Sequence, residues 1–438
     1  MKIARLPKND KTNGWSNMLE EREPRAPLTA ERTADWIVLG AGYAGLAAAR
    51  RLAENRPDET VAVVEAGAVG ENASGRNSGF AIDLPHNVGS SMEELDGSVR
   101  FMRLARAAID HLGSAVEQHG IACDWSRDGK YHAAVSRRGV REVLEPFSAE
   151  LKALGEPQEW VEGDALAERL GTRHFTAAIY TPGSVLMNPA ALVRGLADCL
   201  PENVTLYEGS PVIEAEFRNG VQLRTREGTV RAPRMILAAN GFAEQFGFFT
   251  GRFMHLAAHA SLSRPLTKAE QADFGVEKPW GLTPANAFAG ITMRYTNDRR
   301  ILIRQGLNYC PSQRMSRLEQ ATIRRRHKRL MDVRFPALKG VEIEHTWTGF
   351  VCLSRNSAPG FGKLASNIWG AVCQNAVGVT KGTIGGILAA DMATGRDNPL
   401  IEDMLSLGKP SLMPPRPFLD IGVRARFAWE LWSNRHEA

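Results

Sequence analysis

The sequence predicts an α/β protein in which a parallel-sheet domain is interrupted by an inserted, mainly antiparallel β-sheet domain of α+β type. The first observation is an apolar strand, residues 37–39, that runs into the turn Gly40-Ala41-Gly42-Tyr43-Ala44-Gly45. The second is an apolar strand over residues 60–64 that ends in Glu65. The third is a strand and a glycine-rich helix over residues 368–392, which return to this pattern after a long stretch of alternating strands and charged turns. Together they predict a Rossmann-like domain that is completed only near the end of the chain.

The first glycine turn has the spacing of an adenine-dinucleotide site. Gly40-x-Gly42-x-x-Gly45 lets the backbone turn sharply, lets a pyrophosphate approach, and lets the following helix pack on the strand. The free N–H groups at the start of that helix point at the phosphates, and the helix dipole adds attraction. Glu65 follows Gly45 by about 20 residues, where a carboxylate binds the ribose hydroxyls. We therefore expect a dinucleotide site here, rather than a glycine turn before a core helix.

Composition narrows the possible functions. The chain has 438 residues, of which 43% are hydrophobic and 24% charged, as in an ordinary globular protein with two interleaved domains. Its net charge of +5 is far from that of a nucleic-acid-binding protein, and we interpret the basic cluster at residues 324–329 as a solvated helix face. The five cysteines form no Cys-x-x-Cys pair, which argues against a disulfide framework or a zinc site and suits a reducing compartment.

No apolar run approaches the roughly 18 residues of a membrane span, and the first 30 residues have no signal-peptide pattern. We therefore expect a cytoplasmic enzyme that makes no membrane span; an oligomer is possible.

The other elements follow from local signals taken in order. An arm over residues 1–30 is expected to be anchored by Trp15 on the main body or on a neighbouring subunit. Pro57 ends the first helix, and Asn188 and Pro189 form the N-cap and first position of a later one. Helices are expected over about residues 43–55, 92–118, 146–154, 189–200, 317–333 and 378–392. Strands are expected over about residues 131–135, 204–208, 211–215, 221–225, 229–231, 234–239, 291–295 and 301–305.

Two glycine-rich segments outside the first turn have open interpretations. Residues 70–80 are dense in Gly, Ser and Asn, so they are not expected to form a packed element. They form either a surface loop or a loop of donors around a long cofactor, with Ser74 and Arg76 near phosphate. In the last helix, Gly378, Gly382, Gly385 and Gly386 indicate a close approach, either of a ligand or of a tightly packed neighbouring element.

With these landmarks in place, the chain resembles the FAD-dependent D-amino-acid oxidase superfamily, which includes sarcosine, glycine and γ-glutamylputrescine oxidoreductases. It looks most similar to the γ-glutamylputrescine type. The shared strings are the first glycine turn, Glu65-Ala66, Ala73-Ser74-Gly75-Arg76-Asn77-x-Gly79, Asn188-Pro189, Ala239-Asn240-Gly241, Trp347-x-Gly349 and Pro359-x-x-Gly362.

The resemblance implies a Rossmann-like FAD-binding domain with an inserted substrate domain. Glu65 would hold the adenosine ribose, and Val212 would meet the adenine side through its backbone. The loop from Ser74 to Gly79 would follow the pyrophosphate and reach the isoalloxazine, beside a helix N-terminus at Gly378 to Lys381. The full set implied at the cofactor is Gly40, Gly42, Tyr43, Ala44, Gly45, Glu65, Ala66, Ala73, Ser74, Gly75, Arg76, Asn77, Ser78, Gly79, Val212, Ala239, Asn240, Gly241, Gly378, Val379, Thr380 and Lys381.

The implied FAD is non-covalent. Cys352 resembles the cysteine that attaches flavin in monomeric sarcosine oxidases, but we expect it to be a buried free thiol. The implied FAD-binding domain is discontinuous and comprises residues 31–90, 187–245 and 345–405. The substrate-binding domain comprises residues 91–186 and 246–344, and residues 1–30 and 406–438 form terminal arms.

The expected reaction is FAD-dependent oxidation of an amine or amino acid. Hydride moves from the carbon next to nitrogen to flavin N5, and the resulting imine hydrolyses; O2 or another acceptor then takes the electrons. The chemistry requires orientation and a dry site more than a strong base, so we assign no catalytic residue. The substrate contacts expected are His86, Arg294 and Tyr295, with Arg294 either clamping a carboxylate or lying exposed on its strand.

Several features leave the identity of the substrate undecided. Relatives usually carry a Gly-His-Gly-like turn where this chain has Ala376-Val377-Gly378, and Arg304 and Lys381 replace a glycine and an apolar residue. One alternative is a 2-hydroxy-acid or glycerol-3-phosphate-like dehydrogenase on the same fold, with His86 as the base. Another is a non-catalytic dinucleotide-binding protein. His255-x-x-x-His259 has the spacing of a metal pair but lacks the metalloprotease glutamate, so no metal is expected.

Overall fold

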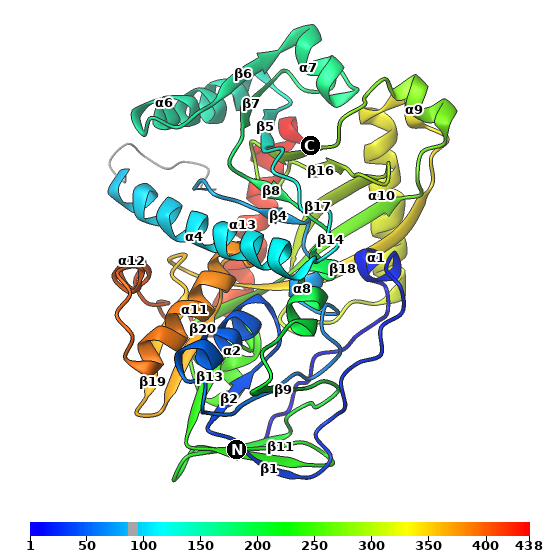
Figure 1. Ribbon diagram of the computed structural model, residues 1–438. Helices are drawn as coiled ribbons and strands as arrows, with labels where there is room; N and C mark the ends of the chain where they lie inside the picture. Colours follow the sequence, from blue (N-terminus) through cyan, green and yellow to red (C-terminus); the bar gives the residue numbers. More distant parts are fainter. Residues whose placement is uncertain (86–94) are drawn as a thin grey trace.

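Two β-sheets organise the protein, a six-stranded one in the lower half of Figure 1 and an eight-stranded one in the upper half. The computed structural model describes residues 1–85 and 95–438. Helices cover one face of the six-stranded sheet, and a four-stranded sheet packs against its other face (Figure 1). This arrangement confirms the predicted α/β class with an inserted, mainly antiparallel part.

The six-stranded sheet is the predicted Rossmann-like sheet. Its strand order is β19-β20-β13-β2-β3-β9, and all neighbours are parallel except the β19–β20 pair. Every residue of β2, β3 and β20 is buried, as expected for strands covered on both faces. The strands are β2 (Trp36–Leu39), β3 (Val61–Val64), β9 (Val204–Tyr207), β13 (Arg234–Leu237), β19 (Gly360–Ala365) and β20 (Ile368–Val372).

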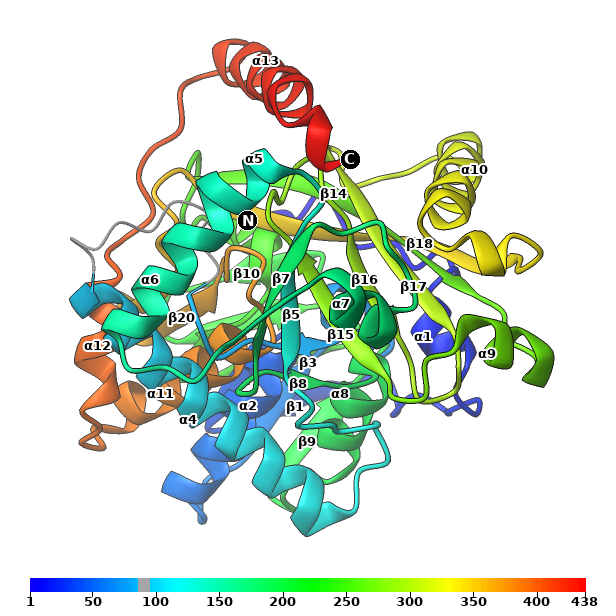
Figure 2. The ribbon, with the colours of Figure 1, turned by 90° about the horizontal axis from the view of Figure 1, so that it is seen from above.

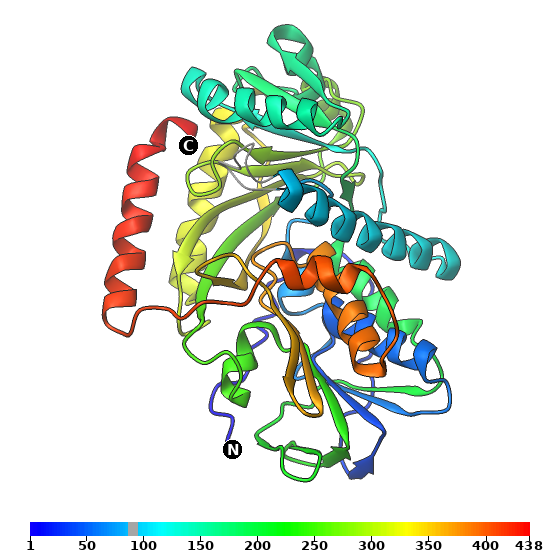
Figure 3. The same cartoon turned by 90° about the vertical axis from the view of Figure 1, so that its left-hand side faces the viewer.

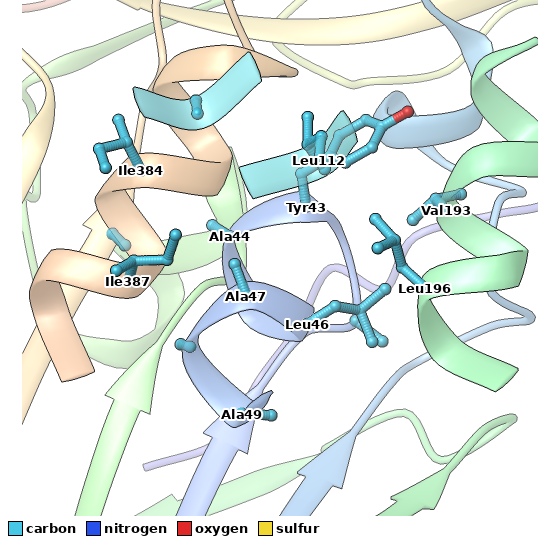
Figure 4. Packing of buried hydrophobic residues seen from close by; sticks show 14 of the residues in the cluster. Tyr43, Ala44, Leu46, Ala47, Ala49, Leu112, Val193, Leu196, Ile384 and Ile387 are labelled. Atoms are coloured by element: carbon cyan, nitrogen blue, oxygen red, sulfur yellow. The ribbon is translucent and has the colours of Figure 1, made fainter. Parts of the chain in front are cut away.

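Helix α2 (Tyr43–Asn55) is the central helix of this half. Figure 4 shows Ile384 and Ile387 of α11 (Thr380–Thr394) on one side of it, and Val193 and Leu196 of α8 (Pro189–Asp198) on the other. A Cβ on Gly386 would lie 2.0 Å from the carbonyl oxygen of Ala44. At least one of the glycines in α11 is therefore required by the close packing of this helix on α2. The outer helices are α4 (Leu95–His119) and α12 (Leu400–Ser406).

A four-stranded sheet of order β1-β12-β11-β10 lies below the parallel sheet (Figure 1). It contains the predicted hairpin, but the strand expected over residues 211–215 begins only at Glu214, and Val212 lies in a connecting segment. The strands are β1 (Glu31–Thr33), β10 (Glu214–Glu216), β11 (Val221–Arg224) and β12 (Thr229–Ala232).

The eight-stranded sheet has the order β18-β14-β17-β16-β15-β5-β7-β6 and is antiparallel except between β5 and β15. The hairpin predicted around residues 297–300 is confirmed as β16–β17. The two longest strands, β14 and β18, had no specific sequence prediction. The strands are β5 (Lys130–Ala134), β6 (Glu159–Glu162), β7 (Ala177–Thr181), β14 (Phe253–Ser263), β15 (Trp280–Pro284), β16 (Thr292–Tyr295), β17 (Ile301–Tyr309) and β18 (Ile343–Ser354).

Helices cover both faces of this sheet. Those around Leu170, Phe274 and Met331 pack on the face away from the parallel sheet, and those around Leu144 and Leu151 pack on the opposite face, beside Ala134 and Ile179. Capping boxes at Thr267 and Ser316 start α9 and α10, and α10 confirms the helix expected over residues 317–333. The helical segments of this part are α5 (Arg137–Gly139), η2 (Val140–Leu144), α6 (Glu145–Ala153), α7 (Gly163–Leu170), α9 (Lys268–Phe274), α10 (Arg317–Arg334) and η4 (Pro336–Leu338).

The two ends of the chain are ordered against the body. The N-terminal arm carries α1 (Gly14–Asn17), and the C-terminal segment carries α13 (Phe418–Ser433), which stands at the edge of the molecule in Figures 2 and 3. Short elements near the centre are α3 (Ala73–Arg76), β4 (Phe80–Ala81), β8 (Val185–Leu186) and η3 (Asn240–Phe246), and η5 (Arg435–Glu437) ends the chain. Among the described helices, none combines the length and apolar composition needed to cross a bilayer.

Candidate functional site

The candidate site lies where the parallel strands end. β2, β3, β13 and β20 run in the same direction, so the segments that follow them meet at one edge of the sheet. In open α/β sheets this edge is where ligands bind. The segments that meet there include the Gly40 turn, Glu65, the turn at Ala239–Gly241 and the turn before α11.

The Gly40 turn packs tightly against the start of the helix that follows it. A Cβ on Gly45 would lie 1.7 Å from the carbonyl oxygen of Gly40, so only glycine fits there. The Glu65 carboxylate accepts hydrogen bonds from the backbone N–H of Ala41 (2.8 Å) and of Gly67 (3.1 Å). Burial raises the pKa of Glu65, and these backbone donors oppose that rise. The carboxylate is thus fixed beside the turn, as a ribose-binding carboxylate would need to be.

The segment after Glu65 repeats the geometry of the first turn. It was predicted to form no packed element, but residues 73–76 form the short helix α3. A Cβ on Gly75 would lie 1.9 Å from the carbonyl oxygen of Gly70, which matches the Gly40–Gly45 approach. The Ser74 hydroxyl oxygen accepts from the backbone N–H of Tyr43 at 3.3 Å, so the two turns face each other. Two facing turns of this kind suit the two halves of a pyrophosphate.

The N-terminal arm binds the segment that follows Glu65, residues 70–79, which we call the second turn. Asn13 Nδ2 donates to the carbonyl oxygens of Gly70 and Gly75, both at 3.1 Å. Trp15 Nε1 donates to the carbonyl oxygen of Asn77 at 2.8 Å. This confirms that Trp15 anchors the arm on the main body.

The side chains of Tyr43 and Arg76 point into protein. The Tyr43 hydroxyl donates to the carbonyl oxygen of Pro189 at 3.0 Å. The Arg76 guanidinium donates to the carbonyl oxygens of Glu71 and Thr348 and pairs with Asp10 at 2.7 Å. If the loop wraps a cofactor, Arg76 was expected near phosphate; its side chain instead ties the loop to β18 and to the arm.

The turns after β13 and β20 hold non-glycine residues in the left-handed region. The φ angles are 45° at Asn240, 54° at Cys373, 50° at Asn375 and 65° at Ala376. Such backbone is costly for residues with a Cβ and is concentrated at ligand sites. These turns therefore have the character of a binding site, not of a simple connection.

The start of α11 has buried polar atoms that need a partner. Thr380 Oγ1 and Gln374 Oε1 are buried and make no hydrogen bond to any described residue. A bound ligand with donors and acceptors would satisfy them, because buried polar atoms are normally hydrogen-bonded. Lys381 lies in the same turn over the Phe101 ring (5.5 Å), and burial lowers its pKa to about 8.

The face of the eight-stranded sheet that meets the second turn is polar and basic. Lys130 and His132 of β5 approach the Thr283 hydroxyl of β15, at 3.5 Å from Nζ and 3.1 Å from Nδ1. Arg304 of β17 donates to the Thr292 hydroxyl of β16 at 2.8 Å. Burial lowers the pKa of Lys130 to about 8 and that of Arg304 to about 10. The carboxylate of the buried Asp83 lies near enough to Lys130 to oppose this lowering, whereas the described residues place no carboxylate within ion-pair distance of Arg304.

The family described as FAD dependent oxidoreductase matches residues 35–392. The chain belongs to this family. FAD is therefore the cofactor of this enzyme, and the paired glycine turns, the fixed Glu65 and the unpartnered atoms at α11 fit a long dinucleotide that ends in a polar ring.

Two curated relatives and one solved structure illustrate the relationship. "Probable oxidoreductase OrdL" of Haemophilus influenzae is 27% identical over 386 residues, covering 85% of this chain and 86% of that protein. The γ-glutamylputrescine oxidoreductase of Escherichia coli is 26% identical over 384 residues, with the same coverage of 85% and 86%. Glycine oxidase from Geobacillus kaustophilus has the same fold, with a TM-score of 0.72 and 19% identity over 88% of this chain and 100% of its own.

Two of the substrate contacts expected in this flavoenzyme have other positions. Arg294 is buried, not exposed, and its NH1 donates to the carbonyl oxygens of Ser78 (3.1 Å), Gly79 (3.1 Å) and Met187 (2.6 Å). It therefore braces the second turn. Tyr295 follows Arg294 on the strand and so points to the opposite face, where it packs against Phe274. His86 lies outside the described residues.

The inner face of the eight-stranded sheet is the one that meets the second turn. The sequence had given its basic residues no role at the substrate, apart from Arg294. The alternation of side chains along the strands places these residues together. Thr292 pairs with Arg304 and lies two residues from Arg294, so all three share the face that meets the second turn. Reading this from sequence would have required the strand register. Arg304 had been noted only as a departure from the relatives.

The remaining candidates have defined places. Cys352 is buried and donates to Asn240 Oδ1 at 3.0 Å, and the neighbouring Cys373 thiol and burial raise its pKa well above the ordinary range. His255 and His259 lie on β14 and contact different partners, Glu244 at 2.9 Å and Thr348 at 3.0 Å. Within the described ranges, no group of three or more His, Cys, Asp and Glu side chains could hold a metal ion.

Proposed function

We propose that this flavoenzyme oxidises an amino acid, or an amine that carries a carboxylate, at the carbon next to nitrogen. The observation that carries the proposal is Arg304. Its guanidinium donates to Thr292 and has no carboxylate within ion-pair distance among the described residues. A planar guanidinium with free donors suits bidentate binding of a carboxylate.

The place of Arg304 supports a role toward substrate. It shares a sheet face with Arg294, whose guanidinium contacts the second turn at Ser78 and Gly79. Arg304 lies two residue pairs further along the same hairpin, and so on the same face. A ligand between this face and the turn would meet both the guanidinium and the proposed position of the flavin.

The same face would also lower the pKa of the substrate ammonium group. Arg304 supplies positive charge in a poorly solvated environment, and like charge lowers the pKa of a bound ammonium group. The substrate nitrogen would then be neutral and keep its lone pair for imine formation. The residues would orient the substrate and exclude water, so the proposal still requires no general base.

We propose that FAD is held without a covalent bond by the residues implied from the sequence, within the discontinuous domain described there. Bound FAD would supply the acceptor for hydride from the substrate carbon, and the imine product would hydrolyse. The hydrogen bond from Cys352 to Asn240 and the raised pKa of its thiol disfavour the thiolate that covalent attachment requires. Release of all yellow colour on acid precipitation is the expected result.

The test is anaerobic mixing of the purified holoenzyme with matched compounds. Each amino acid is compared with the amine that lacks its carboxylate and with the corresponding 2-hydroxy acid. Bleaching of the flavin by an amino acid, with release of ammonia or an amine, is expected. Bleaching only by 2-hydroxy acids would favour the dehydrogenase alternative, and bleaching by none would count against the proposal.

A further inference from the structure

The C-terminal helix α13 exposes a continuous apolar stripe. Phe418, Ile421, Trp429 and Trp432 are 69%, 63%, 52% and 65% exposed. They stand at positions i, i+3, i+11 and i+14, which place them on one face of a helix, with Ala425 between them. A stripe of this length is not the scatter of single apolar residues seen on most surfaces.

The opposite face of α13 fixes it to the protein. Phe427 packs against Phe288 at 5.3 Å, and the Tyr309 hydroxyl donates to Asp420 at 2.6 Å. Just beyond the helix, Glu437 accepts from the backbone N–H groups of Val135 and Ser136, both at 3.0 Å. Figures 2 and 3 show the helix at the edge of the molecule with one side against the body. The apolar stripe is therefore presented outward by a docked helix.

Arginines border the stripe, and the carboxylates of the segment face inward. Arg426 lies over the Trp429 ring at 4.7 Å, and Arg435 over the Trp432 ring at 5.0 Å, while the exposed Arg424 lies over the Tyr309 ring of β17 at 6.0 Å, on the edge of the helix next to the body. Asp420 and Glu437 are engaged by the body, as described above. Glu430 is buried and pairs with Arg426. The outward surface thus combines aromatic side chains with net positive charge.

We propose that α13 binds the surface of a membrane that contains anionic lipids. Tryptophan and phenylalanine on one helix face, with arginines along its edges, suit the boundary between headgroups and acyl chains. A helix of 16 residues that carries arginine lies in this plane and does not cross it. The helix also lies beyond the matched family region, which ends at residue 392. This inference does not rest on the proposed substrate.

A second copy of the chain is a less suitable occupant. Pairing two α13 helices through their stripes would bring the bordering arginines of each copy close to those of the other, and among the described residues only Arg426 of these arginines has a carboxylate partner, Glu430. An anionic surface complements these arginines instead. Each is expected to contribute roughly fivefold in binding.

The test is co-sedimentation of the full-length holoenzyme with phosphatidylcholine vesicles, with and without phosphatidylglycerol. Binding is expected only when phosphatidylglycerol is present, and should weaken as salt is added. The double variant Phe418→Ser/Trp432→Ser should bind at least about tenfold more weakly, and Arg424→Gln/Arg435→Gln roughly twentyfold. Trp160→Ser is the matched control, since Trp160 is also exposed but lies on β6.

Flavin absorbance and the thermal midpoint of each variant verify that folding is unchanged. Absence of binding to anionic vesicles, or equal binding by the stripe variants, would overturn the proposal. A dimer in solution that the same two serine substitutions dissociate would assign the stripe to a second copy and would also overturn it.

Discussion

Among the described residues, the guanidinium of Arg304 hydrogen-bonds to Thr292 alone, and it lies on the face of the eight-stranded sheet that Arg294 shares. Arg304→Met should therefore lower kcat/KM for an amino acid by about 10- to 100-fold, the effect of losing a hydrogen bond between charged groups. The matched amine without a carboxylate should change by less than about threefold, because it never uses that contact.

Steady-state kinetics with the compound pair measures this difference. Arg173→Met is the control, because Arg173 is exposed on the surface of the same half. Equal losses for both compounds would show that Arg304 supports the fold and does not bind the carboxylate.

Lys381 makes the stability of the protein depend on pH. Burial lowers its pKa from 10.5 to about 8, so between these values the unfolded chain binds more protons and stability rises with pH. Below about pH 8 the buried charge is present in full. Lys381→Met should therefore be more stable than the parent by roughly 2–3 kcal/mol at pH 7, and by much less near pH 10.

Urea unfolding at both pH values measures that difference, with the exposed Lys409→Met as control. A difference that stays the same at both pH values would assign the effect to packing over Phe101.

At the residue scale, backbone signals could be predicted and side-chain directions could not. The spacing of Gly40, Gly42 and Gly45 depends on local sterics, which the sequence contains. Arg294 and Tyr295 were both expected at the substrate, but neighbouring residues of a strand point to opposite faces. Which of the two faces inward depends on pairing with distant strands, so the sequence could not decide it.

The N-terminal arm acts as a brace for the second turn. Trp15 contributes a hydrogen bond to Asn77 and packs edge-on against Trp347, with 6.2 Å between ring centroids. Trp15→Phe should cost about 1 kcal/mol by removing the hydrogen bond, and Trp15→Ala about 3–5 kcal/mol by also leaving a cavity. Both should weaken FAD binding in the same order.

Thermal unfolding with and without added FAD measures both effects. Full FAD affinity in Trp15→Ala would show that the second turn is stable without the arm.

Helix α11 can dock on α2 only because of Gly386. An alanine Cβ there would lie 2.0 Å from the carbonyl oxygen of Ala44, so Gly386→Ala should displace the helix and reduce FAD retention. Gly97→Ala is the control: it lies in α4, where no atom of the described residues comes within 4 Å of the added Cβ, and it should be neutral or stabilising by up to about 1 kcal/mol.

Flavin content per protein after purification compares the two variants. Equal, full flavin content in both would contradict a docking role for Gly386.

At the element scale, strong local signals predicted the helices well. The N-cap at Asn188 and the proline after the first helix determine where those helices begin and end. The long strands β14 and β18 were not specified, because their residues mix polar and apolar types without clear alternation. Their stability comes from pairing with each other over their whole length.

The two sheets should unfold together. Trp347 of β18 donates to the carbonyl oxygen of Arg76 at 3.0 Å, and Arg294 of β16 binds three carbonyl groups beside the second turn. The turn thus belongs to both halves. Calorimetry should give one transition, and FAD at about 100 times its Kd should stabilise the whole molecule by about 2.7 kcal/mol. Two transitions, only one of them sensitive to FAD, would contradict this coupling.

At the scale of the whole molecule, the order of segments revealed the fold class. The return of a parallel-type strand near residue 368 predicted that one sheet is built from both ends of the chain, and β20 confirms it. The basic inner face and the outward stripe of α13 were not predicted. Both depend on which surfaces remain uncovered after folding, and local periodicity does not contain that information.

The packing of α2 against α11 has a consequence for synthesis on the ribosome. Arg51 and Asp391, which pair at 2.6 Å, are separated by 340 residues. At typical rates of translation, the nascent first strand and helix wait on the order of half a minute before their last partner emerges. Their apolar faces are exposed during that interval. A chaperone that shields short-lived hydrophobic surfaces should therefore raise the yield of folded enzyme, and slower translation near the 3′ end of the message should lower it.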